Sequence, residues 1–170
     1  MELKRMVSEL LHEGRDDELR RLVATDPRSV RMLLGRLWDA DAVVRRHAAN
    51  ALGEAAVVDP ELGKEILRRL AWALNDESGT NGAPGLAAIG EIGRRVPKLV
   101  VPHLGALVAM AWDEGLRLEL LRALNAIAET DPSLIRPYLA EIEVELESAN
   151  ETEHAAFAAI EELCTRGGSR

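Results

Sequence analysis

The side chains that could carry metal or nucleophilic chemistry are few in this chain and poorly spaced for it. The single cysteine, Cys164, excludes a disulfide framework and a four-cysteine zinc site. The polar run at 76–80 alternates as a calcium loop does, but Asn81 and Ala87 stand where such a loop needs glycine and glutamate. We therefore expect no catalytic group, no metal site and no bound cofactor.

A glycine-rich polar stretch at 75–85, with the sequence NDESGTNGAPG, is the most irregular part of the chain. Gly82 and Gly85 fall where we expect a helix to begin, and each costs up to about 1 kcal/mol of helix stability relative to alanine. Backbone N–H groups left uncovered at the positive end of a helix can bind an anion. Asn81, Gly82 and Gly85 are therefore candidate anion-binding residues. The structural alternative is a surface loop capped by Asn81 or Thr80, with glycines that admit a close neighbour.

Two tryptophans occupy equivalent positions on either side of this stretch, because Trp38 precedes Asp39 and Trp112 precedes Asp113. Aromatic side chains on such an edge are suited to anchor a partner protein. We predict a partner-binding ridge made of Trp38, Asp39, Asn75, Asp76, Glu77, Ser78, Trp112 and Asp113. The structural alternative is that each indole packs over its own turn and keeps its N–H in water. Trp72 lies near an apolar stripe and is expected in the core.

The elements that must position these residues are repeated along the chain. Four segments share one pattern: 51–56 (ALGEAA), 88–93 (AIGEIG), 123–128 (ALNAIA) and 159–164 (AIEELC). Their starts lie 37, 35 and 36 residues apart, and a second series of markers, Asp39, Asp76, Asp113 and Asn150, keeps a spacing of 37. Two marker series with nearly the same period indicate an array of similar structural units.

Apolar residues within each unit recur with helical spacing. Val30, Leu33, Leu34 and Leu37 follow the i, i+3, i+4, i+7 pattern, and 62–74, 100–108 and 135–146 repeat it. The pairs Asp-Pro at 26–27, 59–60 and 131–132 predict helix starts, because aspartate can accept a backbone N–H there and proline loses nothing at the first helical position. Each unit is therefore interpreted as two antiparallel helices joined by a tight turn at the Asp or Asn marker.

The segment at 39–54, DADAVVRRHAANALGE, closely resembles the HEAT-like repeat of the phycobilin-lyase type. In that repeat an aspartate opens the turn, a Val-Arg pair begins the second helix, and Ala-Leu-Gly closes its buried face. The fourth unit keeps Arg117 at the position of Arg45, whereas the fifth has Glu153 there. Arg45 and Arg117 are expected to link the turns of adjacent units, with Asp39 and Asp113 as candidate partners.

The resemblance implies an all-α fold, a right-handed α-solenoid of about five two-helix repeats. We expect one domain at 1–166, with repeats at about 1–26, 27–59, 60–96, 97–131 and 132–165, and a flexible tail at 167–170. Alanine and glycine on the helix faces are expected because they let the helices of adjacent repeats approach closely.

Charge and composition exclude several classes of protein. A formal net charge of −8 argues against a general binder of nucleic acid, and no apolar run is long enough to span a membrane. The start of the chain lacks the apolar stretch of a signal peptide, so a cytoplasmic location is expected. Residues 137–170 carry eight glutamates and two arginines. We interpret that acidic end as a solvated cap of the array, with a docking surface for a basic partner as the alternative.

These observations favour a protein-interaction scaffold or assembly module with no enzymatic activity. Its partner would be a protein, with no nucleic acid and no membrane, and the sequence permits self-association without indicating it. The alternative, which the resemblance implies, is a lyase-like enzyme subunit or helper that binds a tetrapyrrole or another bulky anionic cofactor.

Overall fold

The computed structural model describes residues 2–75 and 82–166, and within these ranges every regular element is a helix. The α-helices are α1 (Glu2–Glu13), α2 (Asp16–Thr25), α3 (Arg28–Arg36), α4 (Ala42–Val58), α5 (Pro60–Leu74), α6 (Ala83–Arg95), α7 (Pro97–Val100), α8 (Leu104–Val108), α9 (Glu114–Thr130), α10 (Leu139–Val144) and α11 (Glu151–Arg166). Short 3-10 helices lie at Val101–His103, Pro132–Leu134 and Arg136–Tyr138. The predicted tail at 167–170 lies outside the described residues.

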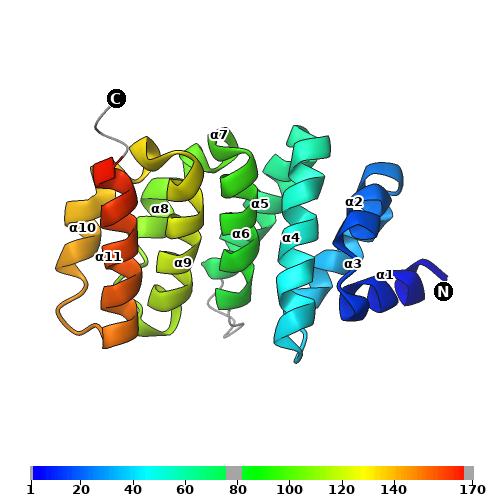
Figure 1. Ribbon diagram of the computed structural model, residues 1–170, viewed down its shortest axis with the longest axis horizontal. Coiled ribbons are helices and arrows are strands. Elements are labelled where there is room, and N and C mark those ends of the chain that lie inside the picture. Colours follow the sequence, from blue (N-terminus) through cyan, green and yellow to red (C-terminus); the bar gives the residue numbers. More distant parts are fainter. Residues whose placement is uncertain (1, 76–81, 167–170) are drawn as a thin grey trace.

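The longer helices stand in a row. Figure 1 shows α2, α4, α6, α9 and α11 side by side in the order of the sequence, and each packs against the next. Helices α5 and α8 lie behind this row, and α5 contacts both α4 and α6. Buried aliphatic side chains fill the space between these layers, among them Leu52, Ile66 and Ile89. An all-helical, layered arrangement thus follows from the predicted apolar stripes.

The helix starts that the Asp-Pro pairs predict are confirmed. The Asp59 carboxylate accepts hydrogen bonds from the backbone N–H groups of Glu61 and Leu62, with Pro60 as the first residue of α5. Asp26 accepts the N–H of Arg28 in the same way, and Asp131 accepts that of Ser133. Each aspartate thereby satisfies a backbone donor that a helix start leaves without an internal partner.

Two of the predicted helices are interrupted. The stripe at 100–108 predicts a single helix, but the structure has α7, a 3-10 turn containing Pro102, and α8. The stripe at 135–146 is broken in the same way around Pro137. Proline lacks the N–H that an α-helix needs and its ring clashes with the preceding turn, so the chain tightens locally to 3-10 geometry. Leu104, Leu107 and Ile142 nevertheless remain buried.

Glycine and alanine allow the helices of the row to approach closely, as the sequence predicts. A Cβ added at Gly53 of α4 would lie 3.0 Å from the Glu91 carbonyl oxygen of α6. A Cβ added at Gly90 of α6 would lie 2.9 Å from Cα of Ala123 on α9. At these two glycines, the α4–α6 and α6–α9 contacts therefore leave no space for a side chain between the helix and the backbone of its neighbour. The equivalent residue on α9 is Asn125, whose larger side chain faces α11.

The arginines that were expected to link adjacent turns do not bond to the carboxylates of the two aspartates. The Arg45 guanidinium donates to the backbone oxygens of Asp39 and Ala40 at 2.7 and 3.0 Å, so it closes its own turn. The carboxylates of Asp39 and Asp113 are engaged elsewhere, because that of Asp113 accepts the N–H of Gly115 at the start of α9. Asp39 is therefore a partner of Arg45, through its backbone oxygen and within the same turn, whereas the Arg117 side chain bonds to residues other than Asp113.

Arg117 does reach the next unit, through a buried ion pair. Its side chain is 2% exposed and donates to the backbone oxygens of Ala111 and Trp112 at 2.7 and 3.2 Å. Nη1 of Arg117 also lies 3.5 Å from Oε2 of Glu153 on α11, whose side chain is 6% exposed. Glu153 and Asn150 exchange hydrogen bonds in a capping box, which holds the carboxylate in place.

Candidate functional site

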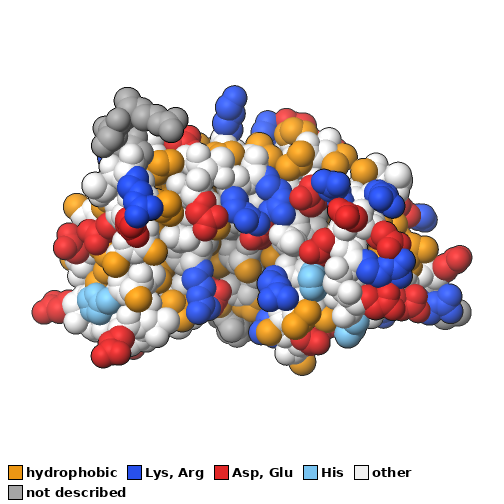
Figure 2. Space-filling view, viewed as in Figure 1, with side chains coloured by type: hydrophobic (Ala, Val, Ile, Leu, Met, Phe, Trp, Pro, Cys, Tyr) orange, Lys and Arg blue, Asp and Glu red, His pale blue; other side chains and the backbone are white. Residues whose placement is uncertain are grey.

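A large surface depression crosses the middle of the row. It is a groove of about 840 Å³, which we call the α4–α6–α9 groove after the helices that line it. Its residues are Trp38 and Asp39 before α4; Ala42, Arg45, Arg46 and Ala49 on α4; Ala83, Pro84, Ala87, Gly90 and Glu91 on α6; and Glu119, Arg122, Ala123 and Ala126 on α9. In Figure 2, Lys and Arg side chains stand on both sides of a hollow over α6.

Small residues make the floor of this groove, and charged residues stand on its walls. Ala83, Ala87 and Gly90 lie on one face of α6, because their spacing of four and three residues matches the helical turn. Arg46 projects from α4 and Arg122 from α9. A floor without long side chains lets an incoming segment approach the backbone of α6 while it contacts the walls of both neighbouring helices.

Most of the charges in the groove are already paired. Glu91 bonds to Arg94 and Arg95, and Glu119 bonds to Arg122 at 2.6 Å. Arg46 is exposed and forms no hydrogen bond or ion pair with any residue in the described part of the chain.

The structure places only some residues of the predicted partner-binding ridge in the groove. Trp38 is 40% exposed and lines the groove together with Asp39. Trp112 is 65% exposed but does not belong to the groove, and Asp113 caps α9. Asn75 ends α5 and donates from its side chain to the Ala71 oxygen. The other ridge residues, Asp76, Glu77 and Ser78, lie outside the described residues.

The core assignment of Trp72 was wrong, because its side chain is 72% exposed. The apolar stripe of α5 runs through Ile66 and Leu70, and a residue two positions after Leu70 is rotated about 200° from it. The helical period therefore points this indole outward, although its apolar character favoured burial. Trp38, Trp72 and Trp112 thus all expose a large part of their surface near the ends of α3, α5 and α8.

The glycines at the start of α6 pack closely against α5. Gly82 is buried, and a Cβ there would lie 3.0 Å from Cα of Leu74. A Cβ at Gly85 would lie 3.3 Å from Cδ2 of Leu70. This packing explains both glycines, because each admits a close neighbour, as the structural alternative in the sequence analysis expects. Asn81, the third candidate anion-binding residue, lies outside the described residues, and anion binding remains a prediction.

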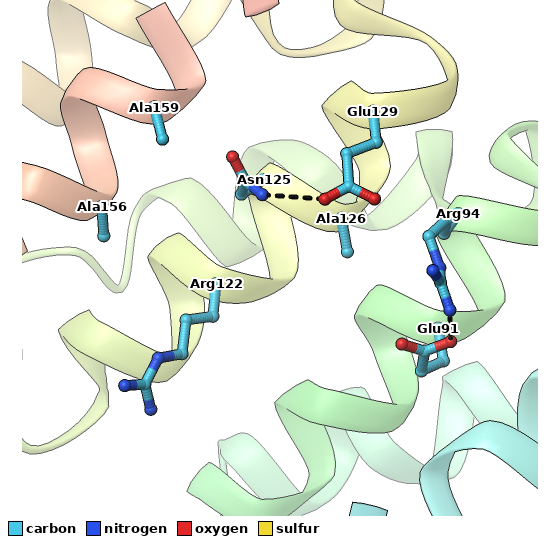
Figure 3. Close-up of a pocket in the computed structure, with 8 residues that line it drawn as sticks. All are labelled: Glu91, Arg94, Arg122, Asn125, Ala126, Glu129, Ala156 and Ala159. Atoms are coloured by element: carbon cyan, nitrogen blue, oxygen red, sulfur yellow. Dashed lines mark hydrogen bonds and ion pairs between the residues drawn. The ribbon is translucent and has the colours of Figure 1, made fainter.

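The groove continues into a smaller pocket of about 320 Å³ between α6, α9 and α11, with which it shares Glu91, Arg122 and Ala126. Figure 3 shows Asn125 on α9 between Glu129 and the alanines of α11. Its Nδ2 donates to Oε1 of Glu129 at 3.2 Å. Its Oδ1 is buried without a hydrogen-bond partner among the residues that the structure describes. This pocket lies where asparagine replaces the glycine that is found at the equivalent positions of α4 and α6.

Cysteine and histidine side chains, which often carry metal or nucleophilic chemistry, are few in this chain. Within 2–75 and 82–166, no three His, Cys, Asp or Glu side chains are grouped to hold a metal ion. Cys164 is buried, and burial raises the pKa of its thiol, so the reactive thiolate is disfavoured. His47 bonds through Nδ1 to Oδ1 of Asp16 at 2.6 Å, and its ring packs over Gly14. No helix in these ranges is long and apolar enough to cross a membrane.

Asp39 lines the groove, and its carboxylate also contributes to the stability of the fold. The pKa of its carboxyl lies below the ordinary value, because the carboxylate accepts the Asp41 N–H and a hydrogen bond from Arg36. A lowered folded-state pKa means that the carboxylate stabilises the fold above the unfolded-state pKa. This contribution is lost as the pH falls through the folded-state pKa.

We therefore expect Asp39→Asn to unfold at a lower temperature than the natural chain near neutral pH, with a gap that closes in acid. Thermal unfolding followed by circular dichroism across the pH range checks this. Asp17→Asn, at an exposed position with a 3.7 Å ion pair to Arg20, is the matched control. A gap for Asp39→Asn that stays constant with pH would contradict the assignment.

Sequence reasoning missed most of the groove, including Arg46, Ala87 and Arg122. The available signal was the recurrence of small residues on the three helices α4, α6 and α9, at 42–49, 83–90 and 123–126. Comparisons of the chain with protein-family models, with curated proteins and with solved structures found no match. The groove must therefore be interpreted from its own residues.

Proposed function

We propose that this chain is a right-handed α-solenoid of HEAT-like repeats that binds a segment of a partner protein in the α4–α6–α9 groove and catalyses no reaction. The repeat assignment is supported by the spacing of the markers at 51–56, 88–93, 123–128 and 159–164 and by the resemblance of 39–54. It is also supported by the row of helices, in which each unit contributes one member and neighbours pack in sequence order.

The observation that carries the proposed function is the groove itself. Three successive helices contribute to it, and it offers an apolar floor beside Trp38 and charged walls. Protein interfaces are enriched in tryptophan and arginine, and their strongest contacts are made where an anchor residue fills a pocket. The exposed Trp72 and Trp112 add apolar surface near the same ends of successive helices.

A photo-crosslinking residue in place of Ala87 tests the proposal. Ala87 is exposed on the floor, so the substitution leaves the buried core intact. We expect crosslinks in native extract to map by mass spectrometry to one contiguous segment of a partner. The same residue in place of Ala106, exposed on α8 behind the row, is the matched control and should not yield this crosslink.

A blocking variant gives the second readout. Ala87→Trp fills the groove and should abolish capture of the crosslinked partner, whereas Ala106→Trp should retain it. Equal crosslinking from both positions, or capture that survives Ala87→Trp, would overturn the proposed function. A coloured ligand that absorbs beyond the tryptophan band and is lost on Ala87→Trp would instead establish the alternative, a lyase-like helper for a bulky anionic cofactor.

A further inference from the structure

Two arginine charges in the α4–α6–α9 groove have no carboxylate counterpart within 2–75 and 82–166. The three carboxylates that line it are each bonded to an arginine, because Asp39 pairs with Arg36, Glu91 with Arg94 and Arg95, and Glu119 with Arg122. Arg45 donates only to backbone oxygens, and Arg46 has no partner among the described residues. As far as the structure describes the chain, the groove therefore presents uncompensated positive charge, although the formal net charge of the chain is −8.

The opposite wall adds a cation that can change partners. Arg122 and Glu119 form an i, i+3 pair whose side chains are 58% and 37% exposed. Exposed pairs of this kind contribute little to stability, so an incoming carboxylate can share or replace Glu119. Guanidinium groups thus stand on both sides of the α6 floor, with Arg46 on α4 and Arg122 on α9.

The shape of the groove suits a helix lying along α6. Its walls are the two neighbours of α6, and packed helix axes lie about 8–10 Å apart, so the axes of α4 and α9 are roughly 20 Å from each other. A further helix can pack over α6 in the depression between these two helices, with small residues of α6 beneath it and Trp38 beside it.

We infer that the segment bound in this groove is an acidic amphipathic helix of a partner protein, whose apolar face lies on Ala83, Ala87 and Gly90 of α6 and whose flanking carboxylates bind Arg46 and Arg122. This inference rests on the proposed function, since it names the chemistry of the bound segment. Opposite charges across an interface fix the orientation of the partner and disfavour like-charged competitors.

A pair of synthetic helices tests the charge requirement. The probe is a fluorescein-labelled peptide of about 14 residues, cross-linked to hold it helical, with leucine and alanine on one face and glutamate on both flanks. Its twin carries lysine at the glutamate positions. We expect fluorescence anisotropy to show at least about tenfold tighter binding of the acidic helix, with a difference that shrinks between about 50 and 300 mM NaCl.

Variants of the chain locate the effect. Arg46→Glu should weaken binding of the acidic helix at least about tenfold and strengthen binding of the basic twin. The matched control is Arg68→Glu, which reverses an exposed arginine on α5 that does not line the groove and should leave both affinities unchanged. Equal binding of the two helices, or equal effects of Arg46→Glu and Arg68→Glu, would overturn the inference.

The two proposals fail differently. If the crosslink from position 87 identifies a partner but the acidic helix has no advantage over its twin, the groove binds a segment of other chemistry and only the inference falls. If no crosslink forms at position 87 and neither helix binds, the proposed function falls as well. A segment crosslinked at position 87 that carries acidic residues on its helical flanks supports both.

Discussion

Replacing Arg117 with methionine is expected to lower the free energy of unfolding by about 3–5 kcal/mol, because it leaves the Glu153 carboxylate buried without its counter-charge. Both residues lie deep in the contact between α9 and α11, at 2% and 4% exposure. The substitution also removes the donors that bond the backbone oxygens of Ala111 and Trp112. Urea unfolding followed by far-ultraviolet circular dichroism measures the loss.

Two further variants separate the ion pair from ordinary packing. Arg45→Met removes the equivalent arginine of α4, which bonds only to carbonyl oxygens, and should cost less than Arg117→Met. Adding Glu153→Gln to Arg117→Met should recover much of the stability, since an amide tolerates burial better than a lone carboxylate and can still accept the Asn150 N–H. A loss below about 1 kcal/mol for Arg117→Met would contradict the buried pair.

The second large effect is expected at Gly90, where substitution by alanine should destabilise the chain by about 1–3 kcal/mol. The added Cβ would lie 2.9 Å from Cα of Ala123, and a backbone atom cannot rotate away as a side chain can. The α6–α9 contact must then widen along its length. Thermal and urea unfolding of the variant measure the cost.

Gly35 provides the matched control, because it is also a helical glycine and a Cβ there meets nothing within 4 Å. Gly35→Ala should stabilise the chain by up to about 1 kcal/mol, the ordinary helix preference of alanine over glycine. The two variants are therefore expected to have opposite signs. A stabilising Gly90→Ala would show that the α6–α9 contact is looser than described.

Local chemistry explains why the helices and their starts could be predicted from the sequence. Apolar spacing and Asp-Pro pairs act over a few residues, so Asp59 caps α5 where the sequence predicts it. The breaks at Pro102 and Pro137 were predictable from the same local rules, since an interior proline cannot donate its missing hydrogen bond. Trp72 was assigned to the core from its apolar character. The helical period, which places it away from the apolar stripe of α5, was the better guide to its exposure.

The groove could not be predicted in the same way, because it depends on which faces of three helices meet the same space. Arg46 and Arg122 are 76 residues apart in the sequence, and only the packing of α4, α6 and α9 places them on opposite walls. The partners of Arg117 were missed for a related reason. Asp39 and Asp113 were predicted as partners because they lie close to the arginines in the sequence. The residue that pairs with Arg117 is instead Glu153 on α11.

The ion pair between Arg117 and Glu153 also restricts how this array can grow by gene duplication. The two residues occupy the same position in adjacent units, each six residues before the alanine that begins 123–128 or 159–164. A duplicated fourth unit placed beside its parent would oppose arginine to arginine in a buried contact. A duplicated fifth unit would oppose glutamate to glutamate. With the repeats proposed above, either duplication therefore requires a compensating change at this buried contact.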